Sequence, residues 1–206
     1  MTRIKICGIS RIDDVEAVNR HLPDYIGFVF AKSKRMVSLD EAAVLKKLLN
    51  PSIKAVGVFV NENTDNIIRL CNLKIIDAIQ LHGDEDKAYI LSLKEKVGIP
   101  VIKAVRVRSK QDIIDAENLP CDYLLLDTYK EDAYGGTGNV FDWSLIPEKT
   151  DRKKPIFLAG GINRDNLSDA ITMAEPYCVD ISSGVETDGK KDPEKIKEVI
   201  SLLRAK

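Results

Sequence analysis

Short runs of apolar and β-branched residues alternate with helix-type patterns along the whole chain. Eight such runs begin near residues 4, 24, 53, 77, 99, 122, 155 and 178. Between them, apolar residues recur three and four positions apart, as on the buried face of a helix; the last such stretch holds Ile196, Val199, Ile200 and Leu203. One run and one helical stretch take about 25 residues, the length of a strand with its covering helix. This alternation predicts parallel strands with helices outside them.

Eight strand–helix units favour a closed (β/α)8 barrel, the TIM-barrel architecture, over an open doubly wound sheet. The open sheet usually has fewer strands and often a G-x-G-x-x-G turn after the first one, whereas the first run here continues into "CGIS", residues 7–10. A chain of 206 residues that is 44% hydrophobic is long enough for one well-buried core and short for two. We therefore predict an α/β protein with one domain, residues 1–206, at the lower end of the usual size of such barrels.

Composition argues against several kinds of partner. The 31 Lys and Arg residues nearly balance the 32 Asp and Glu residues, so no overall field favours nucleic acid or an anionic membrane. No apolar run approaches the roughly 20 residues of a membrane helix, and no charged-then-apolar leader precedes the first run. The four cysteines lack C-x-x-C spacing, so structural zinc is not expected. We expect a cytoplasmic protein whose partner is a small molecule.

The chemistry of such a barrel lies at the carboxyl ends of its strands, so the residues that end the predicted strands are the site candidates. Most of them are polar in an otherwise apolar strand set: Cys7, Arg35, His82, Asp127 and Asp180.

Glycines follow the seventh and eighth predicted strands, in "LAGGIN" (158–163) and "ISSGVE" (181–186). Glycines leave backbone N–H groups uncovered, and a helix N-terminus adds a positive dipole, which together suit a phosphate. Tight turns without a ligand are the alternative, but two such turns at these strands favour phosphate. The predicted phosphate-binding residues are Gly160, Gly161, Ser183 and Gly184.

Cys7 ends the first predicted strand, and Lys5 lies on the same face two residues earlier. A free cysteine is usually a small buried apolar residue. A neighbouring ammonium group, however, lowers a thiol pKa from about 8.5 and favours the reactive thiolate. The other cysteines, Cys71, Cys121 and Cys178, lack this setting and are expected to be packing residues.

Asp127 follows the apolar run "YLLL". An aspartate there is costly to bury without a purpose or a partner, which makes it a candidate general acid. The alternative is that Asp127 only caps the following loop. A base and an acid in one pocket would together transfer protons.

Three further features complete the predicted pocket. His82 is expected to hydrogen-bond to a substrate or a neighbour, because two histidines in the whole chain cannot build a multi-histidine metal site. Arg35 lies in a basic loop, residues 31–38, and its guanidinium fork would clamp a second anion such as a carboxylate; a solvated turn is the alternative. The glycine-rich stretch "YGGTG" predicts a mobile loop over the site that contains Gly135, Gly136 and Gly138.

The motifs along the chain resemble those of the phosphoribosylanthranilate isomerase family. The matching stretches are "KICGI", "GFVF" with "SKR", "VGVFVN", "QLHG", "LLLDT", "GGTG" with "FDW", "LAGGIN" and "DISSGVE" with "GKKD". Their order and spacing, rather than any single motif, carry the resemblance over nearly the whole chain. The loop 30–35 is shorter than the versions with a proline that also occur in the family.

The resemblance implies a cofactor-free (β/α)8 barrel that carries out an Amadori rearrangement in tryptophan biosynthesis. By position in the motifs, Cys7 would be the general base and Asp127 the general acid. Arg35 would face the anthranilate carboxylate, Gly161, Ser183 and Gly184 would hold the phosphate, and His82 and Asp180 would line the pocket.

Two alternatives and the oligomeric state remain open at this stage. A non-catalytic phosphosugar binder would need the glycine turns but neither Cys7 nor Asp127. An aldose–ketose isomerase of histidine biosynthesis would share the fold and the chemistry, but it typically relies on a pair of aspartates, whereas this chain has a cysteine, Cys7, at the end of the first predicted strand. The sequence is compatible with a monomer or a homodimer.

Overall fold

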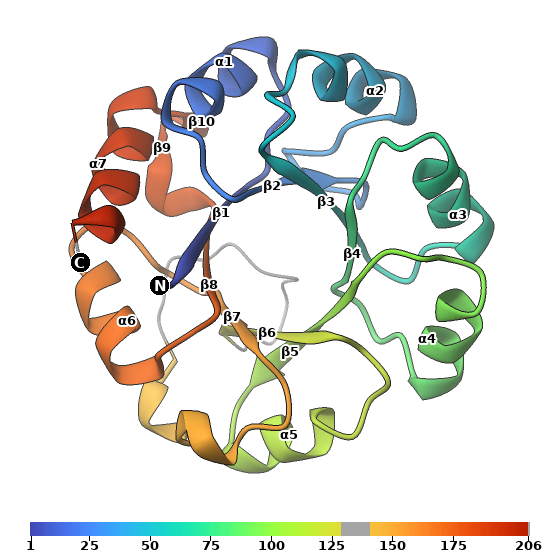
Figure 1. Cartoon of the computed structure of the whole chain (residues 1–206), viewed down its shortest axis with the longest axis vertical. Helices are drawn as coiled ribbons and strands as arrows, with labels where there is room; N and C mark the ends of the chain where they lie inside the picture. The colour runs from blue at the N-terminus through green and yellow to red at the C-terminus, as the bar shows by residue number, and fades with distance from the viewer. Residues whose placement is uncertain (129–140, 206) are drawn as a thin grey trace.

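The computed structural model of the chain describes residues 1–128 and 141–205, which form a closed barrel of eight parallel strands (Figure 1). The strands pair in chain order, and β1 also pairs with β8, which closes the barrel. The strands are β1 Arg3–Cys7, β2 Tyr25–Val29, β3 Lys54–Phe59, β4 Ala78–Leu81, β5 Val101–Val107, β6 Tyr123–Thr128, β7 Ile156–Leu158 and β8 Cys178–Ile181. The predicted (β/α)8 barrel is confirmed.

Helices form the outer ring of the barrel (Figure 1). The α-helices are α1 Ile12–His21, α2 Leu39–Leu48, α3 Thr64–Asn72, α4 Lys87–Lys94, α5 Lys110–Ala116, α6 Leu167–Ala174 and α7 Pro193–Arg204. Three 3-10 turns and a small hairpin add to them: η1 Trp143–Leu145, η2 Lys149–Asp151, η3 Ser183–Val185, β9 Glu186–Thr187 and β10 Lys190–Lys191. None of the helices in the described part of the chain is long and apolar enough to cross a membrane.

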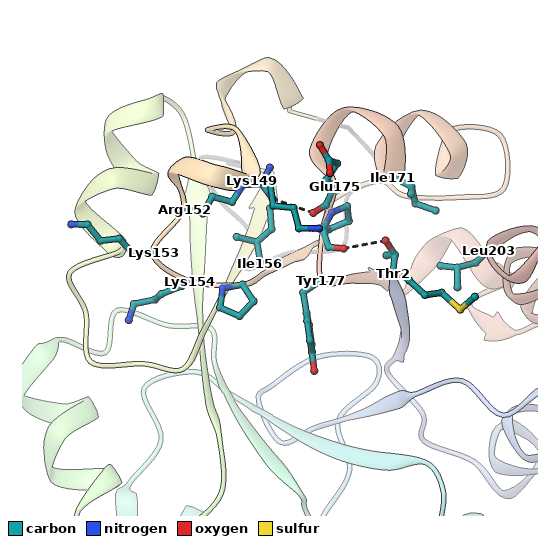
Figure 2. A pocket seen from close by; sticks show the side chains of 13 residues that line it. Thr2, Lys149, Arg152, Lys153, Lys154, Ile156, Ile171, Glu175, Tyr177 and Leu203 are labelled. Atoms are coloured by element: carbon teal, nitrogen blue, oxygen red, sulfur yellow. Dashed lines mark hydrogen bonds between the residues drawn. The ribbon is translucent and has the colours of Figure 1, made fainter. Parts of the chain in front are cut away.

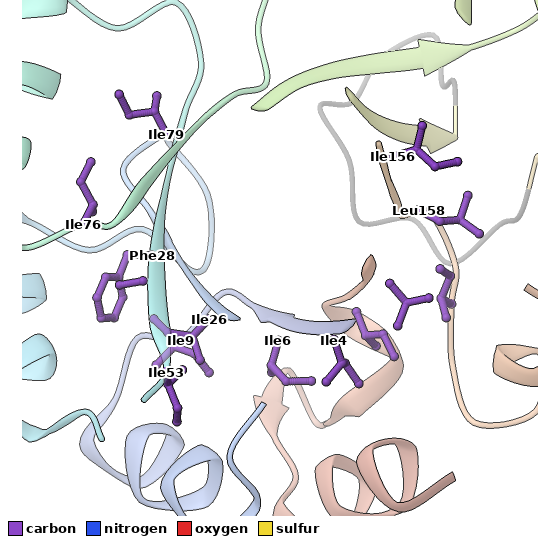
Figure 3. Packing of buried hydrophobic residues seen from close by; sticks show 14 of the residues in the cluster. Ile4, Ile6, Ile9, Ile26, Phe28, Ile53, Ile76, Ile79, Ile156 and Leu158 are labelled. Atoms are coloured by element: carbon purple, nitrogen blue, oxygen red, sulfur yellow. The ribbon is translucent and has the colours of Figure 1, made fainter. Parts of the chain in front are cut away.

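Strand side chains alternate between two packing regions because successive residues point to opposite faces. Ile4 and Ile6 of β1 are fully buried in the large apolar cluster shared by strands and helices (Figure 3). A second cluster includes Val56, Leu125 and Phe157. Ring contacts of Phe157 with tyrosines at the starts of β2 and β6 belong to this second cluster, at centroid distances of 5.6 and 5.5 Å.

Polar residues occupy the barrel interior nearer to the carboxyl ends of the strands. Lys5 on β1, Gln80 on β4 and Asp180 on β8 are all buried, and Lys5 donates hydrogen bonds to both of the others. The barrel is therefore apolar toward the amino ends of its strands and polar toward their carboxyl ends, where the sequence predicts the site.

Candidate active site

A cavity of about 470 Å³ lies at the carboxyl ends of the strands. Its lining contains most of the residues that the sequence predicts for the site, although they are far apart along the chain: Cys7, Arg35, His82, Asp127, Gly160, Gly161, Asp180 and Ser183. Gly184 is not part of the lining; it packs against the turn after β7, where an added Cβ would lie 2.1 Å from the Ile162 carbonyl oxygen. Gly135, Gly136 and Gly138 lie outside the described residues.

Lys5 is a buried cation that pairs with two residues of the cavity lining, Asp180 and Gln80. Its Nζ lies 2.7 Å from Asp180 Oδ2 and 2.8 Å from Gln80 Oε1, and the lysine has no exposed surface. Burial alone lowers the pKa of Lys5, but the charges of Asp180 and of the Cys7 thiolate raise it, and the net result lies above the ordinary value. Lys5 therefore remains an ammonium ion inside the barrel.

The thiol of Cys7 is less acidic than the sequence suggests. Burial raises the pKa of Cys7, and the carboxylate of Asp180 raises it further; Lys5 and Lys191 act in the opposite direction but do not outweigh them. Lys5 thus has the expected effect, while the expectation of a net lowered pKa is wrong. The sequence pattern reveals the neighbouring Lys5. It reveals neither the burial of the Cys7 thiol nor Asp180, which lies 175 positions after Lys5 and pairs with it.

His82 connects the interior to Asp127. Its Nδ1 lies 2.8 Å from Gln80 Nε2, and its Nε2 lies 3.3 Å from Asp127 Oδ2. Asp127 is 5% exposed, and its Oδ1 accepts a hydrogen bond of 2.8 Å from the backbone N–H of Thr128. One oxygen of Asp127 therefore holds the end of β6, as the capping alternative requires, and the other faces His82.

Two buried polar atoms of the cavity residues have no hydrogen-bond partner among the described residues. They are His82 Nε2, whose approach to Asp127 is not aligned for a hydrogen bond, and Asp180 Oδ1. Buried polar groups are almost always paired in folded proteins. These two atoms therefore offer a bound molecule two polar contacts inside the cavity.

The turn after β7 depends on glycine. Gly160 has φ +83° and Gly161 has φ +67°, which side chains rarely adopt. A Cβ on Gly160 would lie 2.3 Å from Thr128 Oγ1 and 2.9 Å from Asp127 Oδ1. The turn therefore approaches the candidate acid closely, and only glycine allows this.

Arg35 reaches the cavity but is held by a residue that the sequence analysis missed. Its Nε and Nη2 donate to the two carboxylate oxygens of Glu186 at 2.7 and 2.8 Å. Lys191 donates to the same carboxylate at 2.6 Å. Burial acts against ionisation of Glu186, but the hydrogen bonds from Arg35 and Lys191 outweigh it and lower the pKa to about 2. The loop after β2 is thus clamped to the segment after β8.

Gly27 is a second residue that the sequence analysis missed. It lies on β2 beside β1, and an added Cβ would be 2.7 Å from Cys7 Sγ and 3.3 Å from Lys5 Cε. A glycine inside a strand often marks such a close approach, and this signal is present in the sequence at "YIGFV".

A larger cavity, of about 710 Å³, contains none of the predicted site residues (Figure 2). It lies near the amino end of β7 and is lined by four cations, among them Arg152 and Lys154. Arg152 donates to the Pro147 carbonyl at 2.8 Å, and Lys154 donates to the Cys121 carbonyl at 2.9 Å. Arg152 and Lys154 thus bind backbone carbonyls of the chain itself. The chemistry of such barrels occurs at the opposite end, at the carboxyl ends of the strands.

The described part of the chain contains no group of three or more His, Cys, Asp and Glu residues that could hold a metal ion. The functional groups that line the carboxyl mouth include a thiol, carboxyl groups, an imidazole, a guanidinium group, an ammonium group and the glycine turn after β7. The fold and these groups define a (β/α)8-barrel enzyme equipped for acid–base chemistry.

Comparison with known proteins identifies the family. The family model of N-(5'-phosphoribosyl)anthranilate (PRA) isomerase matches residues 4–201. The isomerase of that name from Endomicrobium trichonymphae is 50% identical over the full length of both chains, and that of Acetivibrio thermocellus is 45% identical over 99% of this chain and 96% of its own. The crystal structure of phosphoribosyl anthranilate isomerase from Thermotoga maritima superposes with a TM-score of 0.90, at 39% identity and full coverage of both chains. The chain belongs to the N-(5'-phosphoribosyl)anthranilate isomerase family.

The contact of Gly27 with Cys7 predicts that Gly27→Ala displaces the thiol. Because a misplacement of about 1 Å in an active site costs up to about 100-fold in rate, we expect isomerase turnover to fall by about 10- to 100-fold while the circular dichroism spectrum is retained. Gly98→Ala is the control, since nothing lies within 4 Å of its added Cβ. Full activity of Gly27→Ala would contradict the steric argument.

The clamp on Glu186 predicts an acid-sensitive contribution to stability. Its pKa is about 2 in the folded chain against an ordinary 4.5, so the contribution is complete above pH 4.5 and is lost as the pH falls toward 2. Between pH 6 and pH 3, the free energy of unfolding in urea should fall by about 2 kcal/mol more in the wild type than in Glu186→Gln. Equal losses in the two proteins would refute the clamp.

Proposed function

We propose that this chain converts N-(5'-phosphoribosyl)anthranilate to 1-(2-carboxyphenylamino)-1-deoxyribulose 5-phosphate in tryptophan biosynthesis, with residues 1–206 acting as one catalytic domain without a cofactor. The observation that carries the proposal is the convergence of Cys7 and Asp127 on one cavity that also contains the glycine turn after β7. A phosphoribosyl anthranilate isomerase that is 38% identical, with a TM-score of 0.86 and full coverage of both chains, has a solved structure in complex with reduced 1-(o-carboxyphenylamino)-1-deoxyribulose 5-phosphate. Such a ligand fits the anion-binding and acid–base groups of this cavity.

In the first step, Asp127 donates a proton to the ring oxygen of the ribose. The bond between that oxygen and carbon 1 breaks, and the nitrogen lone pair forms the C=N bond of a protonated Schiff base. Asp127 is suited to this step because it is buried at the end of β6 and its second oxygen, Oδ2, lies 3.3 Å from His82 Nε2.

In the second step, the Cys7 thiolate removes the proton from carbon 2 of the sugar. The electrons of the C–H bond form the C1–C2 double bond, and those of the C=N bond return to nitrogen, which gives a neutral enolamine. Tautomerisation then protonates carbon 1 and leaves the ketone at carbon 2. Lys5 supports this step, since its positive charge favours the thiolate form of Cys7 against the effect of burial.

The remaining residues would bind the substrate. Gly160, Gly161, Ser183 and Gly184 would surround the phosphate, and three of these four line the cavity. His82 Nε2 and Asp180 Oδ1 would form hydrogen bonds with the hydroxyl groups of the sugar, since neither atom has a hydrogen-bond partner among the described residues. Arg35 would face the anthranilate carboxylate, sharing its donors between that group and Glu186.

A reducing compartment such as the cytoplasm suits this enzyme, because all four cysteines are free thiols and Cys7 must remain one to act. The partner is the phosphorylated sugar conjugate. A family member from Thermotoga maritima is described as a dimeric enzyme from which monomers were generated; for this chain, monomer or homodimer stays the prediction.

The proposed roles predict that Cys7→Ala and Asp127→Ala each lower kcat by about 100-fold or more, because general acid–base catalysis contributes about that much. The assay is the decay of anthranilate-conjugate fluorescence after protein is added to freshly made substrate. Cys71→Ala, a change at a half-buried thiol on α3, should remain active. An active, folded Cys7→Ala protein would eliminate the proposed base.

A further inference from the structure

A continuous series of side-chain contacts connects Lys5 to Asp127 across the barrel. Lys5 Nζ lies 2.8 Å from Gln80 Oε1, Gln80 Nε2 lies 2.8 Å from His82 Nδ1, and His82 Nε2 lies 3.3 Å from Asp127 Oδ2. Gln80 is 1% exposed and Lys5 has no exposed surface. Lys5 and Gln80 are therefore shielded from water, and both ends of the Gln80 amide find their hydrogen-bond partners within the series, in Lys5 and His82.

The donors and acceptors of this series have one consistent arrangement. Lysine is a donor only, so the carbonyl oxygen of the Gln80 amide faces Lys5. The amide nitrogen, which is also a donor only, then faces His82. Nδ1 of His82 must therefore accept a hydrogen bond, and an imidazole that accepts at Nδ1 is neutral and has its proton on Nε2.

We infer that Gln80 is a positioning residue: held by Lys5, it fixes His82 as the neutral imidazole with its proton on Nε2. That proton points to the side of the cavity where Asp127 lies. A positively charged His82 would have a second N–H group directed at the amide nitrogen of Gln80, and two donors at 2.8 Å exclude each other.

The consequence for the reaction rests on the proposed function. With its proton on Nε2, His82 is a hydrogen-bond donor toward Asp127 or toward the sugar oxygen that receives the proton from Asp127. With its proton on Nδ1, the ring would present a lone pair there instead. Gln80 thus determines which tautomer of His82 faces Asp127. Through Gln80, Lys5 influences the acid of the site as well as the base.

The first test uses the unmodified protein. It is labelled with 15N-histidine, and long-range 1H–15N correlation spectra are recorded at pH 7; the chain has two histidines, so a His21→Gln variant assigns the signals. We expect Nδ1 of His82 to be unprotonated and Nε2 to be protonated. A proton on Nδ1, or protons on both nitrogens, would overturn the inference.

The second test replaces the amide of Gln80 with a carboxylate. Gln80→Glu offers only acceptors to both Lys5 and His82, so Nδ1 of His82 should become protonated in the same spectra. We expect kcat to fall by about tenfold or more with a smaller change in KM, because the change acts on proton transfer. An unchanged His82 spectrum in a folded Gln80→Glu protein would refute the role of Gln80, and an unchanged kcat would refute its importance for the reaction.

Controls separate this inference from the proposed function. Gln111→Glu changes the only other glutamine of the sequence, an exposed side chain that donates to Asp115 on α5, and should leave both the His82 spectrum and kcat unchanged. Gln80→Met, which has no polar end, should abolish the single tautomer and serves if Gln80→Glu does not fold. A wild-type protein with the expected tautomer but without isomerase activity would refute the function and support the tautomer; an active protein with the opposite tautomer would do the reverse.

Discussion

The buried ion pair between Lys5 and Asp180 is the interaction on which the site depends. An unpaired ammonium group inside a protein is strongly unfavourable, and a buried pair is tolerated only when further hydrogen bonds satisfy it. Here Gln80 supplies the additional acceptor, so the first, fourth and eighth strands are tied together at one level of the barrel. Cys7, which ends β1, and His82, which comes directly after β4, take their positions and their electrostatic surroundings from that arrangement.

The same arrangement explains the balance of charges around Cys7. Lys5 and Lys191 lower the pKa of the thiol, whereas burial and Asp180 raise it, and the net effect is a raised pKa. With a raised pKa, the thiolate form of Cys7 is a small fraction of the protein but is strongly basic once formed. Such a base suits the removal of a proton from the carbon next to a Schiff base. Burial and Lys5 therefore act on the thiol in opposite directions, and Lys5 limits the rise in pKa that burial causes.

The sequence predicts the barrel and much of the site because both depend on local patterns. Alternating strand and helix periods mark the eight units, and the carboxyl ends of parallel strands meet at one edge, so Cys7, His82 and Asp127 are brought together by topology alone. Gln80, Glu186 and Lys191 could not be found in this way, because their importance lies in partners many positions away or in a neighbouring loop. The direction of the Cys7 pKa was missed for the same reason: it depends on burial and on Asp180, which no local spacing reveals.

The most direct test of this account measures the pKa of Cys7 through the pH dependence of its alkylation by iodoacetamide, followed by mass spectrometry of the peptide that contains it. Lys5→Met removes a positive charge and should raise the pKa, whereas Asp180→Asn removes a negative charge and should lower it. Opposite shifts would establish that the buried pair controls the thiol. Shifts in the same direction, or none, would contradict the central claim that Lys5 and Asp180 set the ionisation of Cys7.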